Sequence, residues 1–87
     1  MSLEAALELT AQQLAKPATA RRGALMATRW VEVWLAQASP RPGIHETRRV
    51  VQALCALQSD DHAGRATRFL QHVALGGEFP RHNEYGF

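Results

Sequence analysis

The chain has 87 residues, 46% hydrophobic and 21% charged, with a net charge of +2, which fits one domain over residues 1–87 and excludes a charge-driven disordered chain. Its single cysteine excludes an intramolecular disulfide and a cysteine-rich zinc site. No apolar run approaches the roughly 18–20 residues that cross a bilayer, and residues 1–4 lack the basic start of a signal peptide, so we expect a cytoplasmic protein with no membrane association.

Proline, glycine and short Ser/Asp clusters divide the chain into four segments of helical length and a tail. No segment shows the alternation of apolar and polar residues that is typical of a half-buried strand. The sequence therefore predicts an all-α fold, a compact four-helix bundle with an ordered, extended C-terminal tail. The predicted helices cover residues 2–16, 18–38, 44–58 and 60–75, and the tail covers residues 76–87.

The first predicted helix has clear end signals. Ser2 can cap its N-terminus and Pro17 ends it. Its buried stripe consists of Leu3, Leu7 and Leu14, which repeat at helical spacing.

The second predicted helix is apolar over an arc of about 200°, which indicates a helix surrounded on several sides. We expect it to be the central helix. Trp30 and Trp34 lie in this arc and are large for so small a core. Gly23 either lets another helix approach closely or breaks the helix, so that it starts near Ala24. The surplus apolar surface favours a homodimer through this helix, unless the other helices and the tail cover it.

The third and fourth predicted helices are joined by only two or three residues, which predicts an antiparallel helical hairpin. Ser59, Asp60 and Asp61 are candidate caps for the fourth helix, and Gly76–Gly77 is its candidate C-cap. The buried stripe of the third helix is predicted to comprise Ile44, Val50, Val51, Leu54 and Leu57, with Cys55 at its edge, and that of the fourth Ala63, Ala66, Phe69, Leu70 and Val73.

The tail carries an unusual share of the aromatic residues. Phe79, Tyr85 and Phe87 lie in its last nine positions, whereas solvated tails are usually poor in aromatics. Three interpretations follow: the tail folds back on the bundle, it crosses to a twin subunit, or it is a docking arm for another protein.

Residue patterns for catalysis or cofactor binding are weak. His45, His62, His72 and His82 form no i, i+4 pair, so we expect no metal site. Helix capping explains Asp60–Asp61. Cys55 lies in mid-helix beside an apolar stripe, where a thiol usually behaves as a small buried hydrophobe, although an enzyme that uses Cys55 is a third alternative. We expect no cofactor.

Arginine provides the main alternative to protein binding. Arg48 and Arg49 on the third helix and Arg65 and Arg68 on the fourth point outward from the predicted stripes, as in a nucleic-acid-binding helix pair. Nine of the ten Lys and Arg residues are arginine and alanine is abundant, which is typical of GC-rich coding and indicates a bacterial or phage origin.

We therefore predict a non-enzymatic regulator, adaptor or inhibitor that binds another protein through helical faces and its aromatic tail, as a homodimer. The candidate protein-binding residues are Trp30, Trp34, Phe79, Tyr85 and Phe87. The alternative is a small DNA- or RNA-binding regulator that uses Arg48, Arg49, Arg65 and Arg68.

Overall fold

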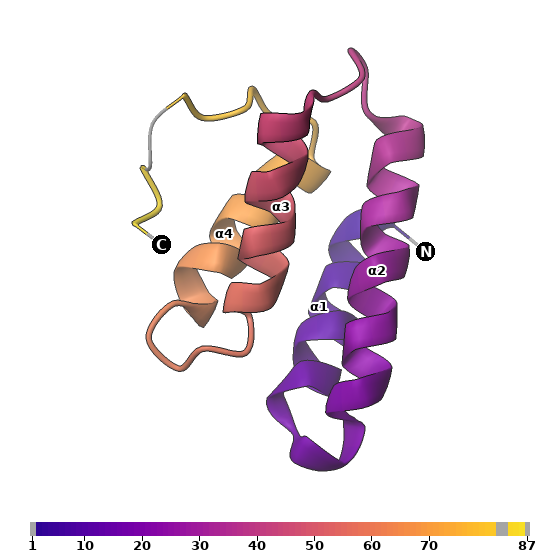
Figure 1. Ribbon diagram of the computed structural model, residues 1–87, viewed down its shortest axis with the longest axis vertical. Helices are drawn as coiled ribbons and strands as arrows, with labels where there is room; N and C mark the ends of the chain where they lie inside the picture. The colour runs from indigo at the N-terminus through magenta and orange to yellow at the C-terminus, as the bar shows by residue number, and fades with distance from the viewer. Residues whose placement is uncertain (1, 82–83, 87) are drawn as a thin grey trace.

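The computed structural model describes residues 2–81 and 84–86 and confirms the all-α prediction (Figure 1). Within this described part there are four α-helices, one short 3₁₀ helix and no strand. The elements are α1 (Leu3–Ala15), η1 (Pro17–Thr19), α2 (Ala20–Gln37), α3 (Ile44–Ala56) and α4 (Ala63–Ala74). No helix among these residues has the length and hydropathy needed to cross a membrane.

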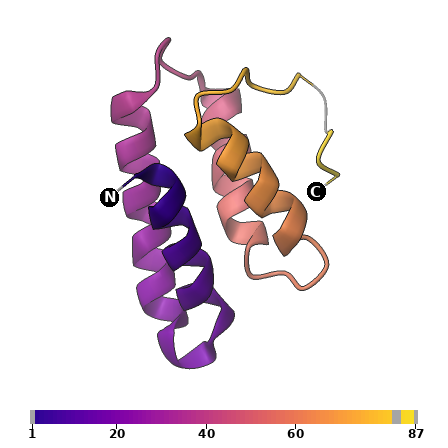
Figure 2. The same cartoon turned by 180° about the vertical axis from the view of Figure 1, so that it is seen from behind.

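Successive helices run in opposite directions and form two pairs, α1 with α2 and α3 with α4 (Figures 1 and 2). Helices α2 and α3 share one face of the bundle, and α1 and α4 share the opposite face. The most extensive packing is along α1 and α2, while α2 touches α3 only lightly. This uneven packing determines which apolar side chains stay exposed.

The two predicted end signals of α1 are confirmed. The Ser2 hydroxyl accepts a hydrogen bond of 3.1 Å from the Ala5 amide, which caps the first turn. Pro17 begins the 3₁₀ turn that redirects the chain into α2. Leu3, Leu7 and Leu14 are all buried, as the stripe predicts.

Helix α2 is unbroken through Gly23, so the close-approach interpretation of this glycine is correct. A Cβ atom at Gly23 would lie 2.8 Å from both the backbone nitrogen and the Cγ of Leu14 on α1. The missing side chain is therefore what lets the two helices approach each other.

Helix α2 is not the central helix that its apolar arc predicts. Its only buried residues are Gly23, Trp30 and Trp34, and all of them lie toward the core that α2 shares with α1. The Trp30 Nε1 donates a hydrogen bond of 2.9 Å to the Leu3 carbonyl, and the two indole rings stack at 6.2 Å between centroids. The tryptophans thus fill the bundle core, while Ala27, Val31, Leu35 and Ala38 of the predicted arc pack against it half-buried and Val33 is exposed.

Helix α4 begins at Ala63, three residues later than predicted. The N-cap is His62, with no side-chain capping bond, and the Ser59 carbonyl accepts a hydrogen bond of 2.9 Å from the Ala63 amide. Residues 59–62 therefore form a turn, and neither Asp60 nor Asp61 caps the helix. The link between α3 and α4 is longer than predicted, but the pair is still antiparallel (Figure 1).

Gly76 follows the C-terminal end of α4 as predicted, and its φ of 78° lies in the left-handed region. After it, the described part of the tail turns back across α3 and α4 (Figure 2). The core contains the buried side chains of all four helices, namely Leu3, Leu7, Leu14, Trp30, Trp34, Val50, Ala53, Leu54, Leu57, Ala66, Phe69, Leu70 and Val73.

Candidate functional site

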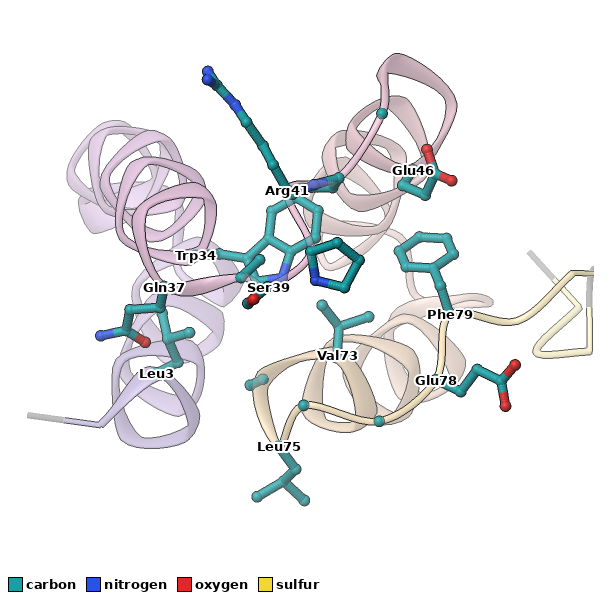
Figure 3. A pocket seen from close by; sticks show the side chains of 17 residues that line it. Leu3, Trp34, Gln37, Ser39, Arg41, Glu46, Val73, Leu75, Glu78 and Phe79 are labelled. Atoms are coloured by element: carbon teal, nitrogen blue, oxygen red, sulfur yellow. The ribbon is translucent and has the colours of Figure 1, made fainter.

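A pocket of about 640 Å³ opens at the end of the bundle where α2 ends, α3 begins and the tail leaves α4 (Figure 3). Trp34, Val73 and Phe79 form its apolar wall, and the loop from Ala38 to Gly43 closes one side. A small-molecule site normally adds a few polar groups that converge on the ligand.

The charged side chains around this pocket do not converge. Figure 3 shows Arg41 extending away from the opening, with Glu46 and Glu78 on separate segments and in different directions. Glu46 lies in the first turn of α3, where its charge favours the helix N-terminus. The pocket therefore has no arrangement for acid–base or nucleophilic chemistry among the described residues.

A second hollow, of about 320 Å³, lies between α2 and α3, where these helices touch only lightly. We call it the α2–α3 groove. Apolar side chains from both helices form most of its surface, with Leu14 of α1 added. The lining residues are Leu14, Ala24, Ala27, Thr28, Val31, Glu32, Val51, Leu54, Cys55 and Gln58.

Helices α2 and α3 carry most of the large exposed hydrophobic side chains of the described chain. Among the described residues, five large hydrophobic side chains are exposed, and four of them belong to α2 or α3. These four are Leu25, Val33, Ile44 and Val51, with 69%, 37%, 66% and 45% of their surface exposed. We call the groove together with the outer surfaces of α2 and α3 the α2–α3 face.

Two of these residues correct the sequence prediction. Ile44 and Val51 were expected in the buried stripe of the third helix, together with Val50, Leu54 and Leu57. The last three are buried, whereas Ile44 and Val51 lie on the side of α3 that α2 leaves uncovered. The sequence pattern shows that they are apolar, but the light α2–α3 contact decides that they are exposed.

The predicted protein-binding residues fall into two groups. Trp30 and Trp34 are core residues, with 1% and 5% of their surface exposed, so they offer little to a partner in this conformation. Phe79 and Tyr85 are half-buried against α4, and Phe87 lies outside the described residues.

Phe69 of α4 is the centre of a cluster that holds the tail, which we call the Phe69 cluster: Phe69, Arg49, His72, Phe79 and Tyr85. Phe79 and Tyr85 meet the fully buried Phe69 ring edge-on, at 5.5 and 5.6 Å between centroids. The Arg49 guanidinium carbon lies 5.1 Å from the Phe69 centroid and 5.3 Å from that of Phe79. Both distances are typical of cation–π contacts.

Three side chains of the hairpin also bind backbone carbonyls of the tail. Arg49 donates to the Pro80 carbonyl, and Arg65 donates to the Gly86 carbonyl at 2.7 Å. The His72 Nε2 lies 2.7 Å from the Glu78 carbonyl oxygen, and donates to it in the tautomer that carries a proton there. The described tail segments thus fold back on their own bundle.

These contacts change the interpretation of the predicted arginine face. Arg49 and Arg65 were expected to point into solvent, but both are engaged with the tail. Arg48 and Arg68 are exposed, as expected. Arg49 and Arg65 therefore bind the tail, although Arg65 stays exposed, whereas Arg48 and Arg68 keep the predicted exposure.

Cys55 is exposed at the edge of the α2–α3 groove, and not the small buried hydrophobe that its position predicts. Within the described chain, no three His, Cys, Asp or Glu side chains gather closely enough to hold a metal ion. His82 lies outside the described residues.

Comparison with known proteins provides no relative for this chain. It matches no protein-family model, and no curated protein or solved structure is significantly similar to it. The functional argument therefore depends on the surfaces described above.

Proposed function

We propose that this protein is a non-enzymatic, cytoplasmic binding protein that forms a homodimer through its α2–α3 face and acts on another protein as a regulator, adaptor or inhibitor. The observation that carries the proposal is the apolar α2–α3 groove, which is lined in part by Val51, one of the five large exposed hydrophobic side chains of the described chain. Apolar surface concentrated in this way usually marks a protein-binding site. The exposed thiol of Cys55 suits a reducing compartment.

The face is large enough for a dimer. A stable protein–protein interface buries about 800 Å² on each partner, roughly one-seventh of the 5917 Å² that this chain exposes. The molecule measures 37 × 27 × 19 Å, and the view down its shortest axis looks onto α2 and α3 (Figure 1). Helices α2 and α3 therefore form one of the two broad sides of the molecule.

Charge also favours a second copy as the occupant. Glu32 lines the groove on the α2 side, and Arg48 lies one helical turn before Val51 on the α3 side. A two-fold axis that runs along the groove, parallel to the helices, sets α2 of each copy against α3 of the other. Glu32 of one copy then approaches Arg48 of the other, so opposite charges face each other across the interface.

Sedimentation equilibrium at micromolar concentrations tests this dimer. We expect a mass near twice the 9.6 kDa of the monomer, and a shift toward 9.6 kDa for Val51→Lys, which places a charge in the groove. Leu75→Lys is the matched control, because Leu75 is 72% exposed outside α2 and α3 and the lysine adds the same charge. A wild-type mass of 9.6 kDa throughout would refute the dimer, as would equal effects of the two variants.

The nucleic-acid alternative has less support. Two of its four predicted arginines, Arg49 and Arg65, already donate hydrogen bonds to tail carbonyls. Non-specific duplex binding depends on arginine and lysine side chains that reach phosphates. Hydrogen bonding of Arg49 and Arg65 to the tail therefore competes with phosphate binding by these two side chains. No observation favours an enzyme that uses Cys55.

A further inference from the structure

We propose that Phe69, Arg49 and His72 of the Phe69 cluster form a binding site for an extended segment of a partner protein in which an aromatic residue precedes proline, and that Phe79–Pro80 of the protein's own tail fills this site in the free protein. The proposal names the partner class for the binding function proposed above. It does not depend on the dimer, because the site lies on α3 and α4 and uses no residue of the α2–α3 groove.

The tail shows what the site recognises. Phe79 meets Phe69 edge-on and lies within cation–π distance of Arg49, so the site accepts an aromatic ring between an aromatic floor and a guanidinium. The next residue, Pro80, is buried. Proline has no backbone N–H, so its burial leaves no donor without a partner, whereas another residue here would bury an N–H group.

The other contacts of the site are with the backbone of the bound segment, so they do not depend on its side chains. Carbonyls on either side of the Phe79 ring accept from two hairpin side chains: His72 contacts that of Glu78 and Arg49 that of Pro80. Any extended peptide presents carbonyls in this way. Proline also restricts the preceding residue to extended backbone conformations. Specificity therefore falls on the aromatic–proline pair.

The way in which the tail is attached allows a partner segment to displace it from the site. Gly76 and Gly77 connect it to α4, and Gly76 adopts a left-handed φ of 78°. Within the described tail, the anchoring side-chain contacts are those of the Phe69 cluster and the Arg65–Gly86 hydrogen bond. A partner segment must compete with this tethered occupant, whose effective concentration is of millimolar order. The tail thus acts as a built-in competitor that sets a threshold for partner binding.

The test uses a fluorescein-labelled peptide, Gly-Gly-Glu-Phe-Pro-Arg, which copies residues 76–81, and measures its fluorescence anisotropy with full-length proteins. Phe79→Ala weakens the resident tail and leaves the site intact. We expect this variant to bind the peptide at least about tenfold more tightly than the wild type, since the variant's tail lacks the contacts of Phe79 with Phe69 and Arg49.

Two double variants identify the site. Arg49→Met added to Phe79→Ala should abolish peptide binding, because it removes the hydrogen bond to the proline carbonyl and the cation–π contacts. Arg48→Met added to Phe79→Ala is the matched control, since it removes the same charge from the adjacent, exposed position. It should leave the affinity within about twofold.

The proposal is overturned if wild type and Phe79→Ala bind the peptide equally, or if Arg49→Met and Arg48→Met have the same effect. Loss of the helical circular-dichroism signal in Phe79→Ala also overturns it, because a tail that the fold requires cannot be displaced. Val51→Lys should leave peptide binding unchanged while it disrupts the dimer. Failure of the peptide site and failure of the dimer are therefore separate results.

Discussion

The same substitution at two glycines should have opposite effects on stability. Gly23→Ala introduces a Cβ atom 2.8 Å from the Leu14 backbone nitrogen, which belongs to α1 and cannot rotate away. Overpacking of this kind costs about 1–3 kcal/mol, against about 0.5–1 kcal/mol that alanine contributes over glycine in a helix. The net destabilisation should be up to about 2.5 kcal/mol, which lowers the Tm of a domain this size by up to roughly 10–20 °C.

Gly64→Ala is the matched control. A Cβ atom there meets nothing within 4 Å, and the residue lies in the first turn of α4. We expect up to about 1 kcal/mol of stabilisation, and a rise in Tm of a few degrees. Thermal unfolding followed by circular dichroism at one fixed protein concentration measures both variants, because a dimer makes Tm concentration-dependent. If Gly23→Ala stabilises the protein as much as Gly64→Ala, the conclusion that α1 packs closely on α2 at Gly23 is wrong.

Trp30→Phe should destabilise the fold by about 2 kcal/mol in urea unfolding, since it removes a buried hydrogen bond to the Leu3 carbonyl and part of a core ring. Trp34→Phe, which breaks no hydrogen bond recorded among the described residues, should cost less, and equal losses would contradict the role given to Trp30 Nε1. Cys55 should react with a thiol reagent rapidly in dilute solution and more slowly as protein concentration rises, because it lines the proposed dimer groove. A rate independent of concentration would place Cys55 outside the interface.

Local signals made the helices predictable. The Ser2 cap, the Pro17 stop and the Gly76 left-handed turn each act within a few residues, and each appears as predicted. The start of α4 was not predictable in this way. Ser59, Asp60 and Asp61 are three adjacent capping residues, and the chain uses this segment for a turn.

Burial within an apolar arc was harder to predict, because it depends on how the helices are arranged. Periodicity shows that Val51 and Leu54 share an apolar side of α3, but only the distance to α2 decides that Leu54 is buried and Val51 exposed. The same reasoning applies to α2, whose tryptophans are buried in the core while Val33 of the same arc is exposed. The packing of one helix against another, which is not local in sequence, determines which apolar side chains are buried.

The tail contacts were beyond sequence reasoning for a similar reason. Helical periodicity places Arg49 opposite the apolar stripe of α3, which normally means solvent exposure. The returning tail covers that side with Phe79 and Pro80, so the guanidinium lies between aromatic rings and a carbonyl. The abundance of aromatics in the tail is the only sequence signal of this packing.

The most direct test of the α2–α3 dimer is a double electron–electron resonance measurement on the protein spin-labelled at Cys55, its only cysteine. The thiol is exposed at the groove, so a two-fold dimer through this face brings two labels together. We expect an intermolecular distance well below the 37 Å length of the molecule, which disappears in Val51→Lys and persists in Leu75→Lys. The absence of intermolecular coupling in the wild type, or a distance longer than 37 Å, would contradict the α2–α3 interface.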